Sequence, residues 1–226
     1  MGVKVENFTI EEARELVSDR LLWPLVRDFL WDFAPQVHPS WLEGMSWRET
    51  LYAASSQVSC LMSSPRVKRY ILDSLGVEPC FHAFPKEDGS RLLLLGGETL
   101  ESAAKWLGAL ACADALRRVT GGAAVRELKA ALPGVYPEVF GYTMYFGEFA
   151  PRGGAEARSS QAEVVEKGCS VLLSALSGLP APLVSRLKLK LPKGLCDAAP
   201  MRGIKLSSIF KLLKLKFPEA YKLCCS

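Results

Sequence analysis

Histidine and cysteine are the residues from which this chain could most readily build a metal site or a nucleophilic pair. The chain has two histidines, His38 and His82, and seven cysteines that include no C-x-x-C pair. Neither histidine stands in an H-x-E or H-E-x-x-H motif, so the spacing typical of metal ligands is missing. We interpret both histidines as structural or solvated residues, while a Cys–His nucleophile assembled from distant residues stays open.

The glycines and carboxylates have structural explanations of the same kind. Gly121 and Gly122 end a predicted helix, and no G-x-x-x-x-G-K-[ST] or strand-linked G-x-G-x-x-G motif occurs. The acidic pairs at 11–12 and at 98 and 101 lie near predicted helix N-termini, where the helix dipole favours negative charge. We therefore predict no enzymatic activity, no cofactor and no metal site, and rank a cysteine-dependent enzyme as the last alternative.

Basic side chains are concentrated toward the C-terminal end. Residues 186–226 contain ten Lys and Arg against Asp197 and Glu219, so they carry +8 while the rest of the chain carries −4. Around residues 208–217 the apolar side chains share one helical face, opposite a set of lysines: Lys205, Lys211, Lys214 and Lys216. This face is either an ordinary solvated surface or a binding site, for which an acidic protein or the inner membrane surface ranks above nucleic acid.

Aromatic side chains are concentrated toward the other end. Residues 21–47 hold four of the five tryptophans. Aromatic residues at this density usually belong to a core, but they also anchor protein interfaces. We therefore predict Trp31 and Trp41, together with the four lysines, as candidate partner-binding residues.

Composition and hydropathy indicate an ordinary globular protein. The chain of 226 residues is 49% hydrophobic and 23% charged, which favours one domain with its own core. An odd number of scattered cysteines favours reduced thiols that mostly act as small buried residues. No window is apolar enough for a membrane-spanning helix, and the first residues lack the pattern of a signal peptide. We expect a cytoplasmic protein.

Capping residues, prolines and apolar spacing predict a succession of helices. Loops are predicted at 77–89 and 151–154, and the many alanines of residues 98–119 indicate a close helix–helix contact. The predicted helices cover residues 10–19, a segment with Pro24 in its first turn, 46–62, 65–76, 98–119, 123–132, 137–146, 160–176 and 208–217.

The fold class that follows is mainly α, a single compact helical domain. A short extended segment fits near residues 91–96, an apolar run, or near residues 186–191, where leucines alternate with Arg and Lys. We expect residues 1–192 to form a helical body that subdivides near 77–90. Residues 193–226 are expected to form a basic amphipathic helix that packs on this body or faces a partner.

Four segments carry a resemblance to a known family. Residues 33–42 read Phe-Ala-Pro-Gln-Val-His-Pro-Ser-Trp-Leu, and residues 92–98 read Leu-Leu-Leu-Leu-Gly-Gly-Glu. They are followed by the alanine-rich residues 106–118 and by Leu-Lys-Leu-Lys-Leu-Pro at 187–192. In this order they resemble segments of the YscK/SctK proteins, the accessory component of the type III secretion sorting platform.

The resemblance implies a helical cytoplasmic adaptor without chemistry of its own. It implies that the chain links the cytosolic domain of the inner-membrane ring protein SctD to the pod protein SctQ, and through SctQ to SctL and SctN. The protein would then be peripheral to the inner membrane through its partners, with no nucleic acid expected. The alternative is a helical regulatory or nucleic-acid-binding module that uses the basic C-terminal region.

Overall fold

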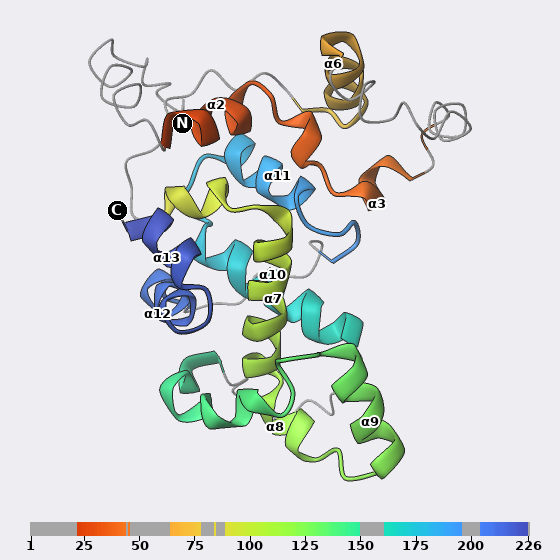
Figure 1. Ribbon diagram of the computed structural model, residues 1–226, viewed down its shortest axis with the longest axis vertical. Coiled ribbons are helices and arrows are strands. Elements are labelled where there is room, and N and C mark those ends of the chain that lie inside the picture. Colours follow the sequence, from red (N-terminus) through yellow and green to blue (C-terminus); the bar gives the residue numbers. More distant parts are fainter. Residues whose placement is uncertain are drawn as a thin grey trace, which may run out of the picture. The chain divides into compact units, whose positions relative to one another are not determined.

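The chain folds into helices, and no β-strand occurs in the part that the structure describes (Figure 1). The structure is a computed structural model, and it describes residues 22–43, 45, 64–77, 84, 89–149, 161–195 and 204–225. The mainly α fold class is thus confirmed. The helices predicted at 10–19 and 46–62, the loop predicted at 151–154, His82 and Trp47 lie outside the described residues.

Contacts divide the chain into two compact units. Unit 1 comprises residues 1–96 and 179–192, and unit 2 comprises residues 97–178 and 193–226. Each unit is therefore built from two separate stretches of the sequence. No helix among the described residues is both long and apolar enough to cross a membrane.

Unit 1 contains short helices whose ends follow the local sequence. In α2 (Leu22–Leu30) the buried residues Leu22, Val26 and Phe29 recur at helical spacing. The predicted helix at 65–76 is confirmed as α6 (Pro65–Ser74), with Pro65 in its first turn and Gly76 in the left-handed region at φ 65° just beyond its end. The remaining elements are η1 (Ala34–Gln36), α3 (Pro39–Leu42), η2 (Ser90–Leu94) and α11 (Ala181–Leu189).

His38 has a structural role at the start of α3. Its Nδ1 lies 3.2 Å from the backbone nitrogen of Ser40, whose N–H it accepts, and 2.7 Å from the Ser40 hydroxyl. The backbone N–H of His38 donates to the carbonyl of Leu189 at 2.7 Å. The residue therefore caps a helix and joins α3 to α11.

The extended segments expected near 91–96 and 186–191 are wrong, because η2 covers Ser90–Leu94 and α11 continues to Leu189. The alternation of leucine with basic residues suggested that every cation faces water. In the structure Arg186 and Lys190 are each 1% exposed and lie one helical turn apart, beside the buried Leu183 and Leu187. When these two residues are counted among the buried positions, the buried positions recur every three or four residues, as in a helix.

Both buried cations satisfy carbonyl groups at the ends of other helices. The Arg186 guanidinium donates to the carbonyls of Phe29 and Leu30 at 2.8 and 3.1 Å, at the end of α2. The Lys190 amine donates to the carbonyls of Leu93 and Leu95 at 2.7 and 3.0 Å, at the end of η2. The last carbonyls of a helix lack partners within it, and these two side chains supply the missing donors. The two side chains therefore hold α11 to both elements.

The buried Lys190 is expected to make the stability of the protein depend on pH. Burial lowers the pKa of Lys190 to about 7. In the unfolded chain a lysine has a pKa near ~10.4, so between these values the unfolded chain binds more protons and stability rises with pH. In urea unfolding, we expect the free energy of unfolding of the wild type to rise relative to that of Lys190→Met, by roughly 1 kcal/mol per pH unit between pH 7.5 and 9.5. A constant difference over this range would contradict the prediction.

Unit 2 is assembled around α7 (Gly97–Ala111) and α10 (Gln161–Ala175), which pack against each other along their lengths. The helix predicted at 98–119 is present but breaks at Cys112, and α8 (Ala113–Arg117) continues it. The remaining helices are α9 (Gly122–Ala131), α12 (Leu206–Lys216) and α13 (Pro218–Cys225). The predictions at 123–132, 160–176 and 208–217 are thus confirmed, while α13 was not predicted.

Two glycines set the distance between α7 and α10. A Cβ atom added to Gly108 would collide with the carbonyl of Val164, and one added to Gly168 would collide with the carbonyl of Ala104. The two backbones are therefore in direct contact. Buried alanines of α7 before and after Gly108 have small side chains that allow this close approach. The close contact predicted from the alanines of residues 98–119 is confirmed.

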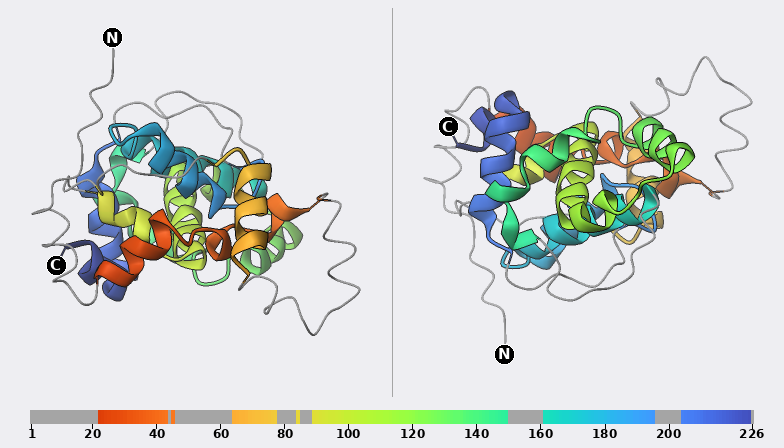
Figure 2. Two further views of the ribbon diagram at one scale, coloured as in Figure 1. Left: turned by 90° about the horizontal axis from the view of Figure 1, so that it is seen from above. Right: turned by 90° about the horizontal axis from the view of Figure 1, so that it is seen from below.

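The helix predicted at 137–146 is wrong, because this region forms three short 3-10 turns: η3 (Glu138–Gly141), η4 (Thr143–Tyr145) and η5 (Gly147–Phe149). Gly141 and Gly147 weaken a continuous helix here. The turns instead bury Val139, Phe146 and Phe149, and the rings of the two phenylalanines stack at 5.8 Å. Figure 2 shows these turns, in green, beside α12, in blue.

Candidate protein-docking site

The predicted lysines of α12 have different surroundings. Lys216 is held in place, because its amine lies 2.8 Å from the Glu138 carboxylate and 4.2 Å from the ring centres of both Trp106 and Tyr142. Its side chain is only 13% exposed. Desolvation opposes its charge, but hydrogen bonds and charge interactions with Glu138 and Tyr142 outweigh this and raise its pKa. Lys216 thus fastens α12 to η3 and α7.

The other three lysines are exposed. The amine of Lys211 donates to the carbonyl of Tyr145 at 3.3 Å and lies 5.4 Å from the centre of the Phe146 ring. Lys214 lies one turn further along, with its amine 5.9 Å from the Tyr221 ring centre. Lys205 is exposed just before α12 begins. We call these three exposed cations together the α12 basic surface.

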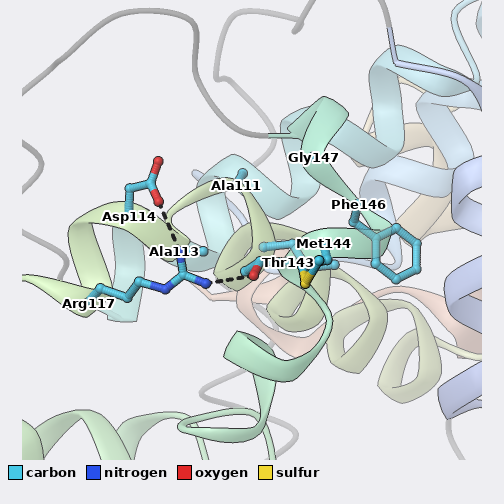
Figure 3. A pocket seen from close by; sticks show the side chains of 9 residues that line it. Ala111, Ala113, Asp114, Arg117, Thr143, Met144, Phe146 and Gly147 are labelled. Carbon is cyan, nitrogen blue, oxygen red and sulfur yellow. Dashed lines mark hydrogen bonds and ion pairs between the residues drawn. The ribbon is translucent and has the colours of Figure 1, made fainter.

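Unit 2 also contains a pocket, and Figure 3 shows the side chains that line it. We call it the η4 pocket, and its volume is about 250 Å³. Its lining is mainly apolar, with one cation and one carboxylate. The lining residues are Leu110, Ala111, Ala113, Asp114, Arg117, Thr143, Met144, Phe146 and Gly147. Phe146 belongs to the pocket and also lies under Lys211, so pocket and basic surface are adjacent.

The two predicted tryptophans also differ. The indole N–H of Trp41 donates to the carbonyl of Leu191 at 2.8 Å, so this side chain joins α3 to the segment after α11. Trp31 is 52% exposed and contacts Trp23 with a distance of 5.7 Å between ring centres. Trp31 is therefore the one of the pair whose ring is available on the surface of unit 1.

Sequence reasoning missed the exposed apolar residues of unit 2. Met144 is 94% exposed, Tyr145 63% and Leu215 49%. Met144 and Tyr145 lie in a segment that was predicted as a helix, where half of such residues would be buried. The only signal was the pair of glycines at 141 and 147, which breaks the helix and turns η4 outward.

Three of the four cysteines among the described residues are buried. Burial raises the pKa of the Cys112 thiol, which keeps it protonated and a poor nucleophile. Cys169 is buried, and Cys225 is exposed beside the buried Cys224. Over the ranges that the structure describes, no group of three His, Cys, Asp or Glu side chains is placed to hold a metal ion.

In the part of the chain that the structure describes, this is an α-helical protein with exposed lysines around α12 and exposed aromatic rings at Trp31 and Tyr145. Residues 28–208 match the family model of YOP proteins translocation protein K (YscK). The chain belongs to this family, whose members are components of type III secretion. The search of curated proteins and the search of solved structures each found no match.

Proposed function

We propose that this YscK-family protein is a non-enzymatic cytoplasmic adaptor of a type III secretion sorting platform. It links the cytosolic domain of SctD to SctQ, and through SctQ to SctL and SctN, at the cytosolic face of the inner membrane. The observation that carries the proposal is the family match over residues 28–208. An adaptor of this kind needs two separate docking surfaces and no active site.

The described residues supply a candidate for each surface. Unit 1 exposes Trp31 against Trp23, and large aromatic side chains are frequent anchors of interfaces. Unit 2 exposes the α12 basic surface, which would attract an acidic partner and accelerate its association. The proposed contribution of Lys216 is indirect, because it positions α12. The proposed contribution of Trp41 is likewise to hold α3 in place.

The test is the formation of a ternary complex from purified full-length protein, SctD cytosolic domain and SctQ of the same source, followed by size-exclusion chromatography at moderate salt. We expect one species that contains all three chains. If the protein binds neither partner although both are folded, the adaptor proposal fails. Salt-dependent binding to generic DNA in place of the partners would instead favour the nucleic-acid-binding module.

Charge reversal at Lys205, Lys211 and Lys214 to glutamate should weaken binding to one partner. Three exposed ion pairs at roughly 0.5 kcal/mol each correspond to about a tenfold loss of affinity. Isothermal titration calorimetry measures this change. The matched control is Lys129→Glu on α9, which is also exposed and should leave both affinities unchanged. Unchanged binding of the triple variant to both partners would exclude the α12 basic surface.

A further inference from the structure

We propose that the η4 pocket, together with the α12 basic surface, receives an acidic segment of a partner protein that inserts one large apolar side chain. The proposal rests on the adaptor function and assigns a place and a chemistry to one of its two interfaces. The proposal is carried by an apolar hollow that has Arg117 in its lining (Figure 3) and Lys211 over the ring of Phe146, another lining residue.

The pocket has the size of a side chain. Its volume of about 250 Å³ is below the roughly 300–1,000 Å³ of small-molecule sites, so it suits an anchor residue better than a cofactor. Leu110, Ala111 and Ala113 line it from α7 and α8, and Phe146 from the other side, all four buried. Met144 stands at the mouth, 94% exposed. Methionine is flexible and polarizable, so it adapts to an apolar partner.

The cations around the pocket are held in position. On one side Arg117 donates to the Thr143 hydroxyl at 2.6 Å and lies 3.4 Å from the Asp114 carboxylate, as the dashed lines in Figure 3 mark. On the other side Lys211 rests over Phe146. Lys211, already fixed by its contacts with Tyr145 and Phe146, loses little conformational freedom when it pairs with an incoming carboxylate, whereas Arg117 already pairs with Asp114.

The same features favour an acidic protein segment over other ligands. A phosphate backbone would use the cations but would leave the hollow and the exposed Met144 and Leu215 without a partner. A purely apolar helix would fill the hollow, but it would offer Lys211 and Lys214 no negatively charged group. A segment that carries Asp or Glu on both sides of Leu, Phe or Met matches both parts.

The test compares Met144→Glu with Tyr70→Glu in the full-length protein. Both positions are exposed, at 94% and 53%, but Tyr70 lies on α6 in unit 1. We expect Met144→Glu to weaken binding to one of SctD cytosolic domain and SctQ by at least about tenfold, as for a central interface residue. Tyr70→Glu should leave that affinity within twofold of the wild type. Circular dichroism and thermal unfolding check that each variant is folded.

A crosslink identifies the bound segment. Tyr145→benzoylphenylalanine places a photoreactive ring beside the pocket, and the expected crosslink joins it to a partner segment with acidic residues next to an apolar one. Wild-type affinity of Met144→Glu for both partners would overturn the inference and leave the adaptor function standing. A crosslink only to a second copy of the chain would also overturn it. Failure of the wild type to bind either partner would remove both proposals.

Discussion

Gly168→Ala is expected to lower the free energy of unfolding by about 3 kcal/mol, at the upper end of the range for overpacked interiors. At a helix position without close neighbours, a Gly→Ala change would stabilise the protein by roughly 0.5–1 kcal/mol. At Gly168 the new methyl group would meet the carbonyl of Ala104, which belongs to the backbone of α7 and cannot rotate away. The two helices must separate, and the buried contacts on either side of the glycine weaken with them.

Urea unfolding of the full-length protein measures this effect, and Gly108→Ala should behave in the same way because its methyl group would meet the carbonyl of Val164. Gly122→Ala on α9 is the matched control, since its Cβ would lie 3.8 Å from a side-chain nitrogen of Arg126, an ordinary van der Waals contact. The control should be neutral or slightly stabilising. If Gly168→Ala behaved like Gly122→Ala, the backbones of α7 and α10 would not be in contact.

Arg186→Met is the second change with a large expected effect, a loss of about 3 kcal/mol in the free energy of unfolding. The substitution keeps an unbranched side chain but removes the donors to the carbonyls of Phe29 and Leu30, and each buried unsatisfied group costs roughly 1–3 kcal/mol. It also removes the guanidinium that lies 5.4 Å from the Phe33 ring centre. Part of the loss is offset because no charge needs to be desolvated.

The control for Arg186→Met is Arg69→Met on α6, in the same unit. Arg69 has a side chain that is 84% exposed and forms an ion pair with Asp73 at 3.7 Å, so its loss should cost less than ~0.5 kcal/mol. Native-state hydrogen exchange adds a local measurement, because protection should fall at the end of α2 and in α11. A destabilisation by Arg186→Met no larger than that by Arg69→Met would contradict the structural role of the buried guanidinium.

Helix boundaries set by proline, glycine and capping residues were predictable, as α6 between Pro65 and Gly76 demonstrates. Two elements were not predictable because tertiary contacts decided them. In α11 the buried positions include Arg186 and Lys190, whose polar ends find carbonyl partners distant in sequence. In residues 137–149 burial of Phe146 and Phe149 favoured 3-10 turns over the expected helix.

The candidate site was predictable in its charge but not in its geometry. The amphipathic pattern predicted that the lysines around α12 lie outside the core, and Lys205, Lys211 and Lys214 are indeed exposed. The partners of Lys216 come from Trp106, Glu138 and Tyr142, which no local pattern connects with α12. The pocket required the same kind of information, since it forms where α7 and α8 meet η4 and η5.

Unit 1 is built from two stretches that are far apart in the sequence, and this affects the order of folding. Hydrogen bonds from Trp41, Arg186 and Lys190 join residues that are 95 to 157 positions apart in the sequence. Closing such long loops is slow compared with forming local contacts. During synthesis residues 22–96 therefore leave the ribosome long before residues 179–192, while α7 and α10 can already pair. Until α11 arrives, the carbonyls of Phe29 and Leu30 at the end of α2 lack the Arg186 guanidinium, so unit 1 stays incomplete.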